Sequence, residues 1–169
     1  LMSGETVVVN EMNSIPNVSI EGLQFNHNGS ALYFVDEDRS GSIYKFVPAV
    51  KNNYSKGQTF VLKVDNFTGD VSAEAGKYPD HNPQQRTGTA NWVAMTDENG
   101  VALTSADPFD NETRGGRAAA DELEATPYRR PEDLEVGYLR NRHEVLYFTA
   151  TEELAVYSVE EPGNGEAMV

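Results

Sequence analysis

The chain has 169 residues, a formal net charge of -14 and no cysteine. The negative charge disfavours nucleic acid as a partner, because neutralising phosphates needs clustered Lys and Arg side chains. The lack of cysteine excludes disulfides, thiolate metal ligands and a cysteine nucleophile. No apolar run approaches the roughly 18 residues of a transmembrane span. The length is sufficient for one domain with a hydrophobic core.

In chain order, short apolar runs separated by turn residues predict a series of short strands. The predicted strands are residues 6–9, 23–25, 31–35, 42–47 and 58–64, with turns rich in Asn, Gly, Asp and Ser between them. Residues 66–91 follow no period and predict a long loop, before a short strand at 92–95 and another loop at 104–116. Only residues 117–123 have a helical composition. The pattern predicts antiparallel β structure with little helix.

One segment of this pattern occurs twice in the chain. Each copy contains Glu, then Leu-Tyr-Phe, then Tyr at matching places: Glu21, 32–34 and Tyr44 in the first, and Glu132, 146–148 and Tyr157 in the second. Repeated strand meanders are typical of β-propeller blades. The chain is therefore predicted to be all-β, a single partial propeller region over residues 1–169. Its blade-like repeats lie at about 20–65 and 130–160 and are joined by the loop-rich segment 66–116.

Two blades cannot close a ring, since propellers generally contain four or more. The sequence looks cut at both ends, and open sheet edges invite association. We therefore expect further propeller blades or other copies of the chain as partners.

The two repeated glutamates are candidate metal ligands. Glu21 and Glu132 begin equivalent strands, and the openings of propeller blades face a shared axis, so their carboxylates are expected to lie near one another. Two such charges are tolerated when a cation or an arginine lies between them. Calcium takes six to eight oxygen ligands. Asp36 and Glu37 are the next candidate donors.

Other interpretations of the same residues remain open. The two glutamates could pair with Arg129, Arg130 or Lys45, or occupy solvated strand ends. Asp36 and Glu37 also fit a polar β-turn. The guanidinium of Arg130 could bind phosphate bidentately, or it could form a salt bridge that holds its loop. The three histidines, in polar stretches far apart, are expected in exposed loops: His27, His81 and His143.

An ordered set of short motifs resembles a known family. The motifs are Tyr-Lys-Phe-Val-Pro at 44–48, Leu-Lys-Val at 62–64, Arg-Pro-Glu-Asp at 130–133 and Tyr-Phe-Thr-Ala-Thr at 147–151. Across residues 20 to 160 their order is similar to that of the PhoX-type alkaline phosphatases, a group of secreted bacterial β-propeller proteins. The resemblance implies that Glu21 and Glu132 are ligands of a metal cluster containing calcium and iron, which binds phosphate and activates its ester.

The chain departs from the family pattern in two places. The upstream segment that supplies the iron-ligating cysteine is absent, and Ile20 stands where the family has histidine. The expected cofactor is therefore calcium; iron, possible in the family, lacks its cysteine ligand here. The expected function is a metal-dependent phosphate-ester hydrolase, or a fragment of one, in the periplasm or outside the cell. The alternative is a non-catalytic, calcium-stabilised secreted propeller used in surface assembly or binding.

Overall fold

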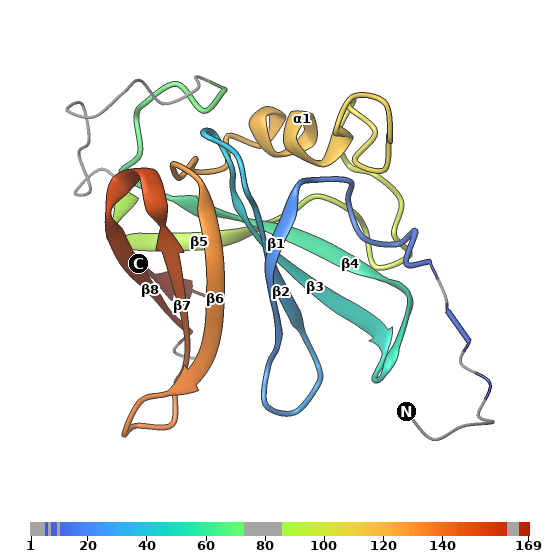
Figure 1. Ribbon diagram of the computed structural model, residues 1–169, viewed down its shortest axis with the longest axis horizontal. Helices are drawn as coiled ribbons and strands as arrows, with labels where there is room; N and C mark the ends of the chain where they lie inside the picture. Colours follow the sequence, from blue (N-terminus) through green and yellow to red (C-terminus); the bar gives the residue numbers. More distant parts are fainter. Residues whose placement is uncertain (1–5, 7, 10, 73–85, 162–165) are drawn as a thin grey trace.

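The computed structural model describes residues 6, 8–9, 11–72, 86–161 and 166–169 (Figure 1). Nine strands form one sheet in the order β1-β2-β3-β4-β5-β9-β8-β7-β6, with every neighbouring pair antiparallel. The strands are β1 (Ile20–Phe25), β2 (Leu32–Asp36), β3 (Ile43–Val50), β4 (Asn53–Val64), β5 (Thr89–Ala94), β6 (Pro131–Tyr138), β7 (Glu144–Ala150), β8 (Ala155–Glu161) and β9 (Glu166–Met168). Helix in the described residues comprises α1 (Gly115–Glu122), the 3-10 turn η2 (Thr151–Glu153) and the 3-10 conformation of Arg86. The predicted all-β fold is confirmed.

The sheet bends until its first and last strands lie side by side, so that it is nearly closed (Figure 1). A Cβ at Gly22 of β1 would lie 2.4 Å from the carbonyl oxygen of Glu132 in β6, so only glycine fits this close approach. Further along, Gln24 Nε2 donates to Glu135 Oε1 at 3.2 Å. β1 and β6 therefore run in the same direction, as the innermost strands of neighbouring propeller blades do.

The two sequence repeats have the same register in the structure. Leu23 pairs with Phe34 in the first meander, and Leu134 pairs with Phe148 in the second. Each meander also has a register irregularity at its repeated glutamate, between Ile20 and Leu23 in the first and between Pro131 and Leu134 in the second. In both, the Leu-Tyr-Phe segment lies in a middle strand, β2 or β7. The two sequence repeats therefore form strand meanders with matching register.

One face of the first meander packs against the opposite face of the second. Tyr33 of β2 faces the core between the meanders, and on the opposite side of that core lies Phe148 of β7. The equivalent residues take the reverse positions: Phe34 faces the other side of the first meander, and Tyr147 is 41% exposed on the outer side of the second. The two meanders are therefore related by a rotation and do not pack with equivalent faces against each other. Neighbouring propeller blades are related in the same way.

The helix α1 covers the outer face of the first meander. Ala119 and Ala120 pack with Phe34 and Tyr44 in a second core cluster. Arg117 of α1 forms a bidentate ion pair with the fully buried Asp36. The Nε and Nη2 atoms of Arg117 each lie 2.7 Å from one of its carboxylate oxygens. This pair fixes the helix against the end of β2.

Some local predictions differ from the structure. Val8 and Val9 of the predicted strand 6–9 are 74% and 89% exposed and lie in no strand; Val7 lies outside the described residues. An apolar run without a partner strand has no ladder to join. The predicted loop 66–91 includes the start of β5 at Thr89, while residues 73–85 of it lie outside the described part.

A carboxylate on α1 makes the stability of the fold depend on pH. Burial, aided by the nearby Asp70, Asp36 and Asp38, raises the pKa of Asp121 from 3.8 to about 6 although Arg117 opposes it. Asp121 also lies in the last turn of α1, where the helix dipole disfavours negative charge. The folded chain thus holds a proton that the unfolded chain has lost, and stability falls as the pH rises from about 4 through about 6.

We expect Asp121→Asn to remove this loss. Because the side chain is only half-buried, solvent screening reduces the gain to about 1 kcal/mol at about pH 7. Urea unfolding of both chains at about pH 4 and about pH 7 measures it. A difference between variant and wild type that is the same at both pH values would contradict this assignment.

Candidate phosphate site

The candidate site lies where the chain enters β6, between two equivalent turns. Arg130 adopts a left-handed backbone conformation with φ of 52°. Its N–H donates to the carbonyl of Asp38 at 2.7 Å, and its own carbonyl accepts from the N–H of Thr151 at 3.0 Å. These two partners lie in the turns that follow β2 and β7, one in each repeat. The backbone of Arg130 is thus held on both sides, which maintains a conformation that costs about 1–3 kcal/mol.

The guanidinium of Arg130 forms ion pairs with carboxylates from both repeats. Its Nη2 binds Glu37, from the turn after β2, and lies 3.0 Å from Glu132 Oε1 in β6. The hydroxyl of Thr151 donates to the same Glu132 oxygen at 2.8 Å. The hydrogen bond to Glu37 is the main reason why the pKa of Arg130 is raised, followed by the charges of Glu37, Glu132 and Glu152.

A polar cleft of about 340 Å³ opens above this arginine. It is lined by Glu37, Asp38, Arg39, Arg130 and Glu152. Arg39 Nε lies 3.1 Å from Glu152 Oε1, so this ion pair also joins the two repeats. The cleft combines two guanidinium groups with three carboxylates, the side-chain types that bind phosphate and hard cations respectively.

The structure brings together three of the five predicted site residues: Glu37, Arg130 and Glu132. The open alternative that Glu132 pairs with Arg130 is what the structure shows, while Lys45 pairs instead with Glu161 at 2.7 Å. That Arg130 binds a phosphate as well stays a prediction.

The carboxylates of Asp36 and Asp38 bind Arg117 of α1 rather than Arg130. Both oxygens of Asp36 bind Arg117, and one of them also accepts the N–H of Ser19 at 2.9 Å. Asp38 Oδ2 lies 2.8 Å from Arg117 Nη1 and 3.6 Å from Arg114 Nη1. The carboxylate of Asp36 therefore has strong partners within the chain, and its metal ligation stays a prediction.

Glu21 is adjacent to Glu132 through the backbone of their strands, because Gly22 packs against the Glu132 carbonyl. Its own side chain is exposed and makes no hydrogen bond or ion pair with a described residue. Glu21 and Glu132 thus lie on strands whose backbones pass close to each other. A direct approach of the two carboxylates stays a prediction.

The chemistry of these donors fits a hard cation, but their number falls short of a full calcium shell. Among the described residues, no three His, Cys, Asp or Glu side chains converge as a metal site. Glu21, Glu37 and Glu132 can supply part of the six to eight oxygens that calcium takes. The remaining ligands would have to come from elsewhere.

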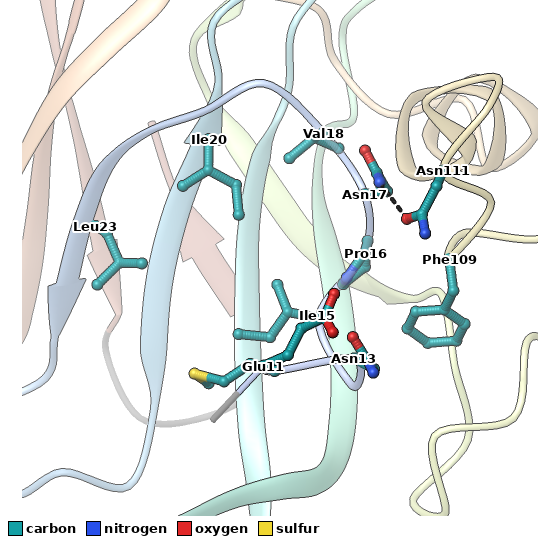
Figure 2. Close-up of a pocket in the computed structure, with 11 residues that line it drawn as sticks. Glu11, Asn13, Ile15, Pro16, Asn17, Val18, Ile20, Leu23, Phe109 and Asn111 are labelled. Atoms are coloured by element: carbon teal, nitrogen blue, oxygen red, sulfur yellow. Dashed lines mark hydrogen bonds between the residues drawn. The ribbon is translucent and has the colours of Figure 1, made fainter. Parts of the chain in front are cut away.

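A larger cavity, of about 570 Å³, lies on the outer face of the first meander and is separate from this cleft (Figure 2). Figure 2 shows Ile20 and Val18 on one side of it and Phe109 and Asn111 on the other, with Asn17 Nδ2 donating to Asn111 Oδ1 at 2.6 Å. None of its lining residues is a cationic group that could bind phosphate. It contains none of the predicted site residues.

The sequence did not predict three residues of the site: Arg39, Thr151 and Glu152. A signal for them was present in the repeat: the register places Ile20 opposite Asp36 and Pro131 opposite Ala150, so Thr151 and Glu152 are the equivalents of Glu37 and Asp38. Aligning the two turns as well as the two strand openings would have identified Thr151 and Glu152. The remaining candidate cation, Arg129, is buried at 4% exposure, and its N–H binds Glu153.

A family model described as alkaline phosphatase PhoX matches residues 18–167. The chain belongs to this family. The match confirms the resemblance found in the motifs, and PhoX proteins are metal-dependent, secreted phosphatases. No curated protein and no solved structure matches the chain significantly. Within the described residues, no helix is long and apolar enough to cross a membrane.

Proposed function

We propose that this PhoX-family chain forms part of a metal-dependent phosphate-ester hydrolase, acting in the periplasm or outside the cell, with Arg130 binding the phosphoryl group. The observation that carries the proposal is the fixed position of Arg130. Its backbone is hydrogen-bonded to both repeats and its guanidinium lies in a polar cleft. Only its Nη2 is engaged by described side chains, so further N–H groups remain for phosphate oxygens. A pre-positioned guanidinium stabilises phosphoryl charge without reorganisation.

The metal in this proposal is calcium, bound in part by Glu21 and Glu132, with Glu37 or Asp36 as the next donor. The cation supplies Lewis acidity that polarises the phosphoryl oxygens. The residues of the chain have separate tasks. Thr151 orients Glu132 through its hydroxyl, and Glu37 holds the Arg130 guanidinium in the cleft.

Further propeller blades, or other copies of the chain, are proposed as partners that complete the site. This is supported by the outer face of the second meander, where Tyr147 is 41% and Val156 70% exposed. The equivalent face of the first meander, which carries Tyr33, is covered by the second meander. By the same relation, a further blade would cover Tyr147 and could bring additional oxygen ligands to the axis.

A phosphomonoesterase assay with metal analysis tests the function. We expect the chain to bind calcium and to hydrolyse a phosphomonoester, with the activity lost in chelator and restored by calcium. Arg130→Gln should lower kcat/KM by about a hundredfold or more, since a charged transition-state contact is removed. Glu132→Gln should lower calcium affinity and thermal stability together, and its stability loss should vanish in chelator.

Lys63→Gln is a matched control, because it removes a half-exposed cation whose only ion pair with a described residue is with Glu124, outside the cleft. Activity that survives chelation, or equal activity of Arg130→Gln and wild type, would contradict the proposed hydrolase. Calcium-dependent stability without hydrolysis would favour the alternative function, a non-catalytic calcium-stabilised propeller.

A further inference from the structure

Arg39 is the second guanidinium of the cleft, and it comes from the other repeat. It follows Glu37 and Asp38 in the turn between β2 and β3, whereas Arg130 precedes β6. Its side chain is 54% exposed, compared with 41% for Arg130. Arg39 therefore lies nearer the mouth of the cleft, where an incoming anion arrives first.

The guanidinium of Arg39 is only partly used within the chain. Its Nε contacts Glu152 at 3.1 Å, and no hydrogen bond from its two terminal nitrogens to a described residue is present. Most of the donors that would grip two phosphate oxygens are consequently free.

Glu152 lies between the two arginines. It pairs with Arg39, and its negative charge also contributes to the raised pKa of Arg130. A carboxylate has the charge and the oxygen spacing that a guanidinium recognises in phosphate. Because its side chain belongs to the short η2 turn at the rim, it can turn toward solvent without disturbing the sheet.

We propose that Arg39 and Arg130 together form a phosphate subsite. The Glu152 carboxylate stays paired with the Arg39 guanidinium until phosphate displaces it. This deepens the proposed function, on which it rests, by adding a binding residue and an internal competitor. Arg39 binds the phosphate oxygens nearer the mouth of the cleft, and Arg130 binds those deeper in it. Glu152 lowers the affinity for phosphate, which favours release of the product.

Calorimetric titration of the full chain with inorganic phosphate, in calcium and at constant ionic strength, tests the subsite. Arg39→Gln is expected to weaken phosphate binding about tenfold or more, as is usual for loss of a hydrogen bond between charged groups. Arg39→Lys should recover only part of this, because an ammonium cannot bind two oxygens in the same plane. Glu152→Gln should tighten binding several-fold.

The matched control is Arg114→Gln. Arg114 is exposed to the same extent as Arg39, at 56% of its side chain, and it contacts Asp38 at 3.6 Å, so its removal changes the net charge equally. Its phosphate affinity is expected to equal that of wild type.

Each outcome decides the proposal. If Arg39→Gln binds phosphate as wild type does while Arg130→Gln does not, the two-arginine subsite is wrong and the proposed function still stands. If Arg39→Gln and Arg114→Gln lose affinity equally, the effect is one of overall charge and the subsite is also wrong. An unchanged affinity in Glu152→Gln overturns the role of Glu152 as competitor. If wild type binds no phosphate, the subsite and the proposed function fail together.

Discussion

Replacing Asp36 by Asn is expected to destabilise the fold by about 3–5 kcal/mol. Asp36 is fully buried, and it accepts two hydrogen bonds from Arg117 and one from the backbone of Ser19. The neutral amide leaves the Arg117 guanidinium, whose side chain is only 18% exposed, without its main counter-charge. Breaking one side of a buried ion pair costs this much because the other charge stays desolvated.

Urea unfolding, with Glu124→Gln as control, measures the effect of Asp36→Asn. Glu124 forms an ion pair with Lys63 on the surface, 74% exposed, so its loss is expected to cost less than about 1 kcal/mol. The double variant Asp36→Leu with Arg117→Met removes both charges and should recover much of the stability. A loss in Asp36→Asn that appears only with calcium present would instead identify Asp36 as a metal ligand and contradict the ion-pair explanation.

The role of Asp36 illustrates which features the sequence could predict. The repeat was visible because strands at a blade opening must keep their apolar alternation and a fixed distance to the next strand. It predicted that the two Leu-Tyr-Phe segments are equivalent middle strands, and the structure adds the matching register pairs Leu23–Phe34 and Leu134–Phe148. What the repeat cannot reveal is the partner of an acidic side chain. Arg117 lies 81 residues beyond Asp36, on a helix whose docking depends on the tertiary fold.

The same limit explains the other differences. The junction between the meanders, where β5 pairs with β9, involves only three residues of β9, too few to show a period. The Arg39–Glu152 pair joins two turns that have different sequences in the two repeats. In contrast, Arg130 was identifiable because it directly precedes Pro131 and the repeated glutamate, a local pattern.

A second large loss of stability is expected when Glu153 is replaced by Gln. Glu153 is 4% exposed, beneath the candidate site, and its carboxylate accepts the N–H of Arg129 at 2.7 Å and the O–H of Tyr157. Arg86, itself buried, lies 3.6 Å away through its Nε. Burial and the hydrogen bond to Glu153 raise the pKa of Tyr157, so its hydroxyl stays a donor to the carboxylate. The amide removes the negative charge that the buried Arg86 contacts, leaving that guanidinium without this counter-charge.

We expect Glu153→Gln to lower the free energy of unfolding by about 3–5 kcal/mol. Urea unfolding measures it, with Glu160→Gln as the control because Glu160 forms a half-exposed pair with His143 and should cost about 1 kcal/mol or less. Tyr157→Phe removes only the neutral donor, so its cost should be near 1 kcal/mol. If Tyr157→Phe costs as much as Glu153→Gln, the hydroxyl rather than the charge balance stabilises this layer. If neither variant differs from the control, the network is not a stabilising element. Glu153 also holds the turn that carries Thr151 and Glu152, through its hydrogen bonds to Arg129 and Tyr157. Because Glu153→Gln weakens these bonds, phosphate binding should weaken in the same variant.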